Sequence, residues 1–210
     1  MKDKNDKIKP KGKKLLLTVL ILCIAALAVY GVRWLKLSVA GPASSIPARA
    51  KGDPNASIKI VEFMDFQCPA CAQGALFLGD YLEKNPGKIY LEVKYFPLER
   101  NHIHAVRAAR YAECASRQGK FWKVHDLLMK RQAEWRDLLN AEPLFENIVQ
   151  TAQLDPQKLD VCLAEDSVSD LIIREKKEGQ ARGIVSTPTY FVNGKMVVGP
   201  AGLKKELGVQ

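Results

Sequence analysis

The apolar positions of this chain form one long uninterrupted run near its start and several shorter, periodic groups after it. The long run covers residues 15–32 without a charged residue, and as an α-helix it would measure roughly 27 Å. The hydrocarbon core of a bilayer is about 30 Å thick, so the run can just cross it. We therefore predict a transmembrane anchor over residues 15–34, after a basic tail over 1–14. An Ala-, Ser-, Pro- and Gly-rich linker over 35–56 is expected to follow it.

The shorter apolar groups predict an α/β domain over residues 57–210. A strand, a helix and a second strand follow one another with a short return, which implies a right-handed parallel unit. Apolar residues then recur at helical spacing over about residues 102–182, and strand patterns return after this helical insertion. The expected elements on either side of the insertion are strands over 58–63, 89–96, 189–192 and 195–198, and helices over 69–85 and 201–207.

The charge of the chain is concentrated near its N-terminus. The formal net charge is +9, but residues 1–42 hold nine basic and two acidic side chains, which leaves only +2 on the remainder. The remainder shows no basic stripe with interleaved aromatic residues, so we predict no nucleic-acid partner. Lysines dominate the segment before the apolar run, and the positive-inside rule therefore places the N-terminus in the cytoplasm and the domain outside.

A cleaved signal peptide is the alternative for the N-terminal segment, because residues 38–40 (Ser, Val and Ala) have small side chains at the two key positions of a cleavage site. However, the apolar run is longer than a usual signal-peptide core, and charged residues over 33–36 separate it from that site. A lipid attachment at Cys23 fits poorly, since Leu22 stands where a small residue is needed. We therefore expect an uncleaved anchor.

The strongest chemical signal is the sequence Cys68-Pro69-Ala70-Cys71, which follows a predicted strand and opens a predicted helix. The unpaired N–H groups and the dipole at a helix N-terminus stabilise a thiolate, so the pKa of Cys68 should fall. Cys71 is expected one helical turn further in, behind Cys68. We therefore predict that Cys68 attacks or is attacked in disulfide exchange and that Cys71 resolves the intermediate, with Cys68–Cys71 as the redox disulfide.

Two cysteines at this spacing could also form half of a zinc site. A second ligand pair at metal spacing is missing from the sequence, since Cys114 and Cys162 each stand alone. An inert structural disulfide would be unusual at this spacing after a strand. We predict neither a metal nor another cofactor. The histidines are interpreted as structural, and only His102, among His102, His104 and His125, is kept as a neighbour of the cysteine motif.

Glu62 is expected beneath the cysteine motif, because it shares a face of the first predicted strand with the apolar Ile60. A buried carboxylate is costly unless it has a partner or a task. Burial would raise its pKa, and it could then exchange a proton with Cys71. The alternative is an acid that is paired with a basic side chain such as a lysine.

Two segments that are far apart in the sequence carry a family resemblance. The first is residues 61–71, with Glu62 and the two cysteines, and the second is residues 183–194, where Thr187-Pro188 directly precedes a predicted strand. Together they resemble the DsbA-like thiol:disulfide oxidoreductases of the thioredoxin superfamily, over about residues 55–207. The resemblance implies a thioredoxin fold with an inserted helical domain.

The resemblance also implies roles for single residues. Cys68 would be the exposed nucleophile and Cys71 its buried partner. Glu62 matches the family's buried acid by its position six residues before Cys68. Pro188 matches the cis-proline that faces the disulfide, and Thr187 would offer backbone groups to a bound peptide strand.

Two further features follow from the same resemblance. Similar proteins often join two helices of the insertion by a second disulfide, which would be Cys114–Cys162 here; the alternative is two buried, unlinked cysteines. The strongest oxidases of the family carry His before the second cysteine, where this chain has Ala70. An imidazole can help to stabilise the thiolate and a methyl group cannot, so we expect a milder oxidant.

The resulting prediction is an enzyme that introduces disulfides into exported proteins with free thiols. A membrane quinone-linked protein, DsbB-like or functionally similar, would reoxidise it. The expected location is the bacterial cytoplasmic membrane, with a single span and the catalytic domain on the periplasmic side. A disulfide reductase or isomerase of the same fold is the alternative, and a non-catalytic binding module or chaperone is a third.

Overall fold

The computed structural model of the protein describes residues 20–23, 27 and 46–209. The chain divides into two units, Met1–Ala43 and Ser44–Gln210, and the fold below is that of the second. The predicted basic tail and most of the predicted anchor lie outside the described residues. Within the residues that are described, no helix is both long enough and apolar enough to span a bilayer.

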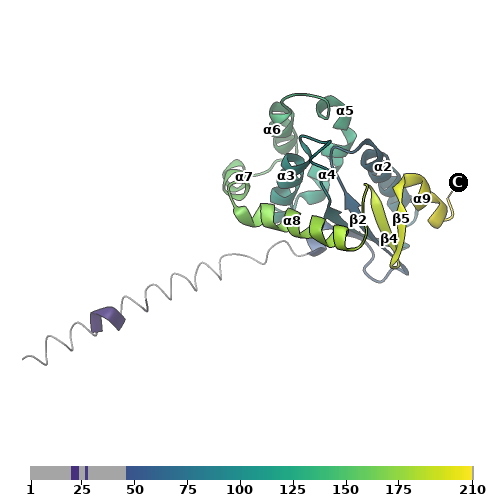
Figure 1. The fold of residues 1–210 in the computed structure, drawn as a ribbon, viewed down its shortest axis with the longest axis horizontal. Helices are drawn as coiled ribbons and strands as arrows, with labels where there is room; N and C mark the ends of the chain where they lie inside the picture. The colour runs from purple at the N-terminus through teal and green to yellow at the C-terminus, as the bar shows by residue number, and fades with distance from the viewer. Residues whose placement is uncertain (1–19, 24–26, 28–45, 210) are drawn as a thin grey trace, which may run out of the picture. The chain divides into compact units, whose positions relative to one another are not determined.

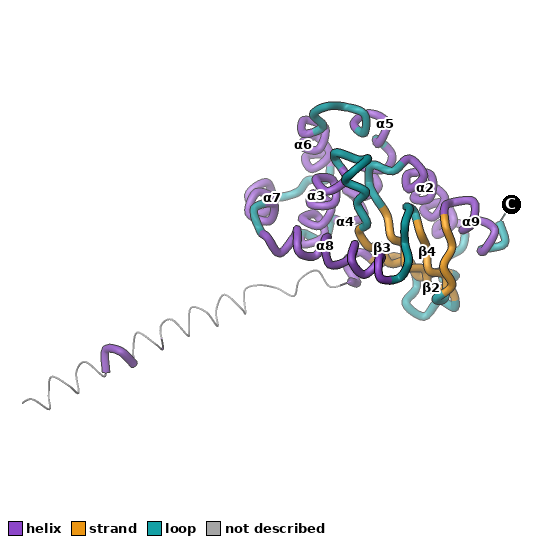
Figure 2. The backbone as a smooth tube through the Cα atoms, in the orientation of Figure 1, coloured by secondary structure: helices purple, strands orange, loops and turns teal. Residues whose placement is uncertain are grey.

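A mixed five-stranded sheet forms the centre of the domain, with the strand order β1-β3-β2-β4-β5. The two central strands β2 and β3 run parallel, and every other neighbouring pair is antiparallel. Figures 1 and 2 show this sheet with helices packed around it. The strands are β1 (Ala50–Gly52), β2 (Ile58–Met64), β3 (Ile89–Tyr95), β4 (Thr189–Val192) and β5 (Lys195–Val198).

Helices cover both faces of the sheet. On one face, α2 and α9 contact each other, and α9 also contacts β4 and β5. On the other face, Gly179 of α8 packs against the rings of Phe63 and Phe96. All four residues of β4 are buried because the strand lies between these two layers. The helical elements are η1 (Ile46–Arg49), α2 (Pro69–Lys84), α3 (Ala105–Arg117), α4 (Phe121–Lys130), α5 (Gln132–Trp135), α6 (Glu142–Thr151), α7 (Pro156–Leu163), α8 (Asp166–Ala181) and α9 (Gly199–Glu206).

The helical insertion lies between β3 and β4 and consists of α3 to α8. Its internal breaks follow local sequence signals. Asp155 caps α7 by accepting hydrogen bonds from the backbone N–H groups of Gln157 and Lys158, and Pro156 occupies the first turn. The insertion returns the chain to β4, and Asn193-Gly194 then form the left-handed turn between β4 and β5. The predicted α/β fold with a helical insertion is therefore confirmed.

The linker predicted over residues 35–56 differs from the structure, which has ordered elements from residue 46 onward. Strand β1 pairs with β3 at the edge of the sheet, and Arg49, only 1 % exposed, donates a 2.9 Å hydrogen bond to Glu175 of α8. The small residues around Arg49 gave no strand signal, because β1 has three residues and its partners are more than thirty positions away.

Candidate functional site

The two cysteines lie where α2 begins. Cys68 is the N-cap residue with an extended backbone, and Pro69 occupies the first turn, where its missing N–H group costs nothing. The backbone N–H of Cys71 donates to the carbonyl oxygen of Cys68 at 3.0 Å, which places Cys71 one turn into the helix. Cys68 is 8 % exposed and Cys71 is fully buried, and both are free thiols in this structure.

The surroundings of Cys68 favour its ionised form. Its pKa is lowered from 9.0 to about 5, chiefly by a hydrogen bond from the Cys71 thiol. The Thr187 side chain and the backbone N–H groups of Ala70 and Cys71 also lower the pKa, and they outweigh the opposing effect of burial. Cys68 is therefore a thiolate at neutral pH, the reactive form of a cysteine.

Cys71 is affected in the opposite direction. Burial raises its pKa well above the ordinary value, and the neighbouring Cys68 and Glu62 raise it further. A backbone hydrogen bond from Asp65 to the Cys71 sulfur, at 3.4 Å, opposes this shift only in part. Cys71 therefore holds its proton at neutral pH, and a base must remove that proton before Cys71 can attack another sulfur.

Glu62 lies on β2 and is 1 % exposed. Burial raises its pKa to about 8, although the nearby Tyr190 side chain opposes the shift. Its Oε1 atom has no hydrogen-bond partner among the described residues, so the alternative of a lysine partner finds no support. A carboxyl group with this pKa is protonated in most molecules at pH 7, and it can exchange a proton with Cys71 near neutral pH.

The loop before β4 completes the site. The Thr187–Pro188 peptide bond is cis. When protonated, the Cys68 thiol donates to the Thr187 carbonyl oxygen at 3.3 Å. The buried Thr187 hydroxyl makes no hydrogen bond of standard geometry to any described residue, which leaves it available to the Cys68 thiolate, whose pKa it lowers. Pairing of β4 with β2 brings this loop to the cysteines. The structure thus gathers Glu62, Cys68, Cys71, Thr187 and Pro188 around the start of α2.

Asp65 is a buried residue of the site that the sequence analysis missed. Its carboxylate accepts hydrogen bonds from the backbone N–H groups of Gln67 at 2.7 Å and Leu98 at 2.8 Å, and it bonds His102 Nδ1 at 2.7 Å. The bond to Asp65 raises the pKa of His102, and the charge of Cys68 raises it further. An aspartate directly after a buried strand was the signal available. Asp65 fixes the loop that leads into Cys68.

The other predicted residues lie in the insertion. Cys114 of α3 and Cys162 of α7 form a disulfide with an S–S distance of 2.05 Å, the pairing that the resemblance implied. His104 bonds the carbonyl oxygen of Leu138, and His125 bonds Asp126. The bond of His104 links the start of α3 to the loop after α5, whereas that of His125 lies within α4.

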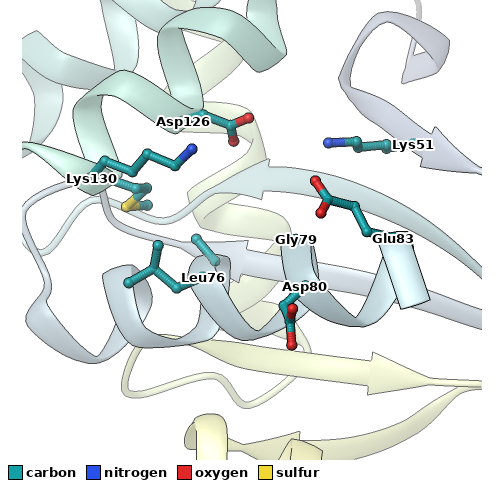
Figure 3. Close-up of a pocket in the computed structure, with 9 residues that line it drawn as sticks. Lys51, Leu76, Gly79, Asp80, Glu83, Asp126 and Lys130 are labelled. Atoms are coloured by element: carbon teal, nitrogen blue, oxygen red, sulfur yellow. The ribbon is translucent and has the colours of Figure 1, made fainter. Parts of the chain in front are cut away.

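A separate hollow with a volume of about 210 Å³ lies along the later turns of α2. Figure 3 shows the side chains that line it. Its charged lining comes from Lys51 of β1, from Asp80 and Glu83 of α2, and from Asp126 and Lys130 of α4. None of the five residues gathered at the start of α2 lines it. The hollow carries mixed charges and no cysteine, so disulfide chemistry centres on the start of α2.

A sequence model of the thioredoxin family, described as "Thioredoxin", matches residues 44–206. Among curated proteins, the chain is 33 % identical over 157 residues to Na(+)/H(+) antiporter NhaA 3 of Salinispora tropica, which is 73 % of this chain and 23 % of that protein. It is 35 % identical over 156 residues to Na(+)/H(+) antiporter NhaA 1 of Mycobacterium sp. (strain KMS), 71 % of this chain and 24 % of that protein. The chain thus spans about a quarter of the length of these curated relatives.

The fold is similar to solved structures of thiol-disulfide proteins. α-DsbA1 of Wolbachia pipientis superposes with a TM-score of 0.66 at 21 % identity, covering 76 % of this chain and 87 % of that chain. BdbD of Bacillus subtilis superposes with a TM-score of 0.65 at 19 % identity, covering 79 % and 94 %. A thioredoxin-like oxidoreductase of Silicibacter pomeroyi superposes with a TM-score of 0.64 at 22 % identity, covering 80 % of this chain and 92 % of that chain. The chain therefore belongs to the thioredoxin family, and its fold is that of the DsbA-type thiol-disulfide oxidoreductases.

Proposed function

We propose that this protein is a thiol:disulfide oxidoreductase that acts by dithiol–disulfide exchange at Cys68 and Cys71. The observation that carries the proposal is the opposite electrostatic setting of the two thiols. The pKa of Cys68 is lowered to about 5, and that of the buried Cys71 is raised. A stable thiolate is a good leaving group, and a buried partner with a high pKa re-forms the disulfide only when a base assists it.

In the oxidising direction, a substrate thiolate attacks the Cys68 sulfur of the oxidised enzyme. The Cys68–Cys71 bond breaks, a mixed disulfide forms on Cys68, and Cys71 leaves as a thiolate that takes the proton of Glu62. A second substrate thiolate then attacks the substrate sulfur of the mixed disulfide. The substrate leaves with a new disulfide, two electrons remain on the enzyme thiols, and Cys68 departs as the stable thiolate.

We further propose that the substrates are exported proteins and that a membrane quinone-linked protein accepts the two electrons. The apolar run over residues 15–32 supports a single-pass location in the bacterial cytoplasmic membrane, with the domain on the periplasmic side. The Cys114–Cys162 disulfide supports an oxidising compartment. An anchor would hold enzyme and electron acceptor in one plane and raise their effective concentration.

A reductase or isomerase of the same fold is the second candidate. Ala70 favours it, because no imidazole stands between Pro69 and Cys71 to stabilise the thiolate. A protein-disulfide isomerase of Novosphingobium aromaticivorans also shares the fold, with a TM-score of 0.60 at 20 % identity. The reduction potential of the Cys68–Cys71 pair separates the two candidates. A potential well above about −200 mV supports the oxidase, and one near about −270 mV supports the reductase.

The experiment that tests the proposal is capture of mixed disulfides by a Cys71→Ala variant in cells. This variant retains the nucleophile but cannot resolve the intermediate, so exported proteins should be found linked to Cys68. The matched control is Cys68→Ser/Cys71→Ala, which should capture none. If Cys68 of the single variant reacts with an alkylating agent and yet no partner is captured, the enzyme proposal is wrong. Full function in a Cys68→Ser variant would instead favour the binding module or chaperone.

A further inference from the structure

A second buried polar side chain lies next to Glu62. Tyr190 of β4 is completely buried and stands directly opposite Glu62 in the antiparallel β2–β4 pair. Directly opposed residues of an antiparallel pair project from the same face of the sheet, and their Cβ atoms are about 5 Å apart. The phenol and the carboxyl group therefore share the face of the sheet that α2 covers.

Gly74 of α2 provides the room that the Tyr190 hydroxyl occupies. A Cβ atom at position 74 would lie 2.1 Å from Tyr190 Oη, closer than any real contact between such atoms. The next nearest atoms, Tyr190 Cζ and Pro188 Cγ, would lie at 3.5 and 3.7 Å, which is ordinary contact. A glycine inside a helix is less favourable than an alanine, so this position needs a reason. The reason in this structure is the hydroxyl group.

The polar atoms of this pair have no other partners. Within the described part of the chain, neither Tyr190 Oη nor Glu62 Oε1 makes a hydrogen bond with standard geometry, and both atoms are buried. Buried polar groups in proteins are almost always paired, either directly or through water. Two unpaired groups on one face of one strand pair are the natural partners of each other.

The direction of the hydrogen bond follows from the electrostatics. Burial raises the pKa of Tyr190, and the charges of Glu62 and Cys71 raise it further, so the phenol keeps its proton and acts as the donor. The titratable groups that act electrostatically with Glu62 are Cys71 on α2 and Tyr190 on β4, and Cys68 acts in turn on both of these. On the remaining side, its neighbour in β3 is the apolar Val93.

We propose that Tyr190 is a positioning residue for proton exchange at the cysteine pair: its hydroxyl donates to the Glu62 carboxylate that remains when Glu62 gives its proton to Cys71, and Gly74 leaves room for that hydroxyl. The inference rests on the proposed function for its role in exchange. The hydrogen bond itself is a property of the fold. Tyr190 touches no sulfur atom of the substrate and acts only through Glu62.

The test is direct titration of the Glu62 carboxyl group by carbon NMR in the oxidised protein, for wild type and Tyr190→Phe. Loss of the donor destabilises the carboxylate, so the titration midpoint should rise by about 0.5 to 1 pH unit. Tyr90→Phe is the matched control, because it removes a phenol of β3 that lies beside Lys59; its midpoint should equal that of wild type. An unchanged midpoint in Tyr190→Phe overturns the inference.

A double-mutant cycle with Gly74→Ala separates this contact from general loss of stability. In wild type, the added methyl group meets the hydroxyl, so Gly74→Ala should lower Tm and raise the Glu62 midpoint. In the Tyr190→Phe background the same methyl group meets only atoms at ordinary contact distance. The double variant should therefore regain Tm while its Glu62 midpoint stays raised. An equal loss of Tm in both backgrounds overturns the assigned role of Gly74.

Failure of the proposed function would look different. If oxidised wild type transfers no disulfide to a model dithiol peptide, the enzyme proposal fails, whatever the Glu62 titration shows. If transfer occurs, Tyr190→Phe should shift the pH profile of transfer upward by the same amount as the Glu62 midpoint. A raised Glu62 midpoint with an unmoved pH profile of transfer overturns the part of the inference that concerns exchange.

Discussion

When protonated, the Cys68 thiol donates a hydrogen bond to the Thr187 carbonyl oxygen at 3.3 Å, although the two residues are 119 positions apart in the chain. The contact exists because β4 pairs with β2 and thereby brings the loop before β4 to the start of α2. The nucleophile therefore lies between a helix N-terminus and the loop that carries the cis-proline.

The first prediction concerns the Thr187 hydroxyl. Its hydrogen bond lowers the pKa of Cys68, which lies at about 5. Thr187→Val removes the donor and keeps the shape, so the pKa of Cys68 should rise by about 0.5 to 1 unit. The pH dependence of alkylation of reduced protein measures this shift. Thr151→Val, on α6, is the control and should leave the midpoint of the alkylation curve at its wild-type value. Equal midpoints for wild type, Thr187→Val and Thr151→Val would contradict the role assigned to the Thr187 hydroxyl.

The second prediction concerns the stability of the reduced protein. A cysteine whose pKa falls from 9.0 to about 5 on folding stabilises the native state above pH 9, and this contribution is lost as the pH falls toward 5. At pH 7 it should amount to about 3 kcal/mol. In urea unfolding, the free energy of unfolding of the reduced protein should therefore rise relative to that of the oxidised protein as the pH rises from about 5 to about 9.

The same thiolate sets the reduction potential, because stabilising the reduced form makes the pair a stronger oxidant. Cysteines at the start of a Cys-x-x-Cys helix have pKa values from about 3.5 to about 7. The value of about 5 for Cys68 lies between these limits, so we expect a potential between about −270 and about −120 mV.

Cys68→Ser serves as the control for the urea-unfolding experiment on the reduced protein, and its stability should lack the pH dependence. A difference between reduced and oxidised protein that stays constant with pH would refute this account.

The third prediction is that Glu62→Gln stabilises the protein and slows exchange. The pKa of Glu62 is raised to about 8 by burial, so the folded state resists its ionisation, and stability falls as the pH rises from about 4.5 to about 8. Removing this effect should raise the free energy of unfolding by about 2 to 3 kcal/mol at pH 7. Disulfide transfer should slow because Cys71 loses its proton donor.

Glu83→Gln is the matched control, since Glu83 is an exposed carboxylate of α2. It should change neither stability nor transfer measurably. A Glu62→Gln variant that is destabilised at every pH, or that transfers disulfides at the wild-type rate, would show that the carboxyl group is structural.

The sequence predicted those parts of the site that depend on local order. A cysteine at a helix start and an acid in a buried strand can each be recognised within a few residues, as Cys68 and Glu62 were. Tyr190, Asp65 and Arg49 were missed, because each acquires its importance from a partner that the topology supplies. Tyr190 alone is one more aromatic residue in a strand, and only its register opposite Glu62 gives it a role.

The fourth prediction concerns the Cys114–Cys162 disulfide, which closes a loop with a sequence separation of 48. Loop-closure entropy gives an upper value of about 4 kcal/mol for its contribution to stability. Cys114→Ala/Cys162→Ala should lose up to this amount in urea unfolding and keep its disulfide transfer, because the redox pair lies on α2. Wild type with this disulfide selectively reduced should lose a similar amount. A large loss in the variant but not in the reduced protein would instead indicate lost packing.

The fifth prediction concerns Arg49, the buried cation next to β1. It bonds Glu175 at 2.9 Å, lies 3.7 Å from Glu113, and stacks over the Tyr95 ring at 4.4 Å. Arg49→Met would leave the buried Glu175 without a compensating charge and Glu113 with only Arg117, at 3.6 Å, and breaking a buried pair costs about 3 to 5 kcal/mol. Urea unfolding should show this loss at neutral pH.

Two further variants identify uncompensated charge as the cause. Arg49→Met/Glu175→Leu should recover much of the loss, because it removes one of the stranded carboxylates together with the cation. Arg131→Met breaks an exposed pair with Glu134 and should cost at most about 1 kcal/mol. If Arg49→Met lowers the free energy of unfolding by no more than Arg131→Met does, the buried charges do not hold η1 and β1 to α8. If the double variant recovers nothing, the loss comes from the packing of Arg49 on Tyr95 and not from its charge.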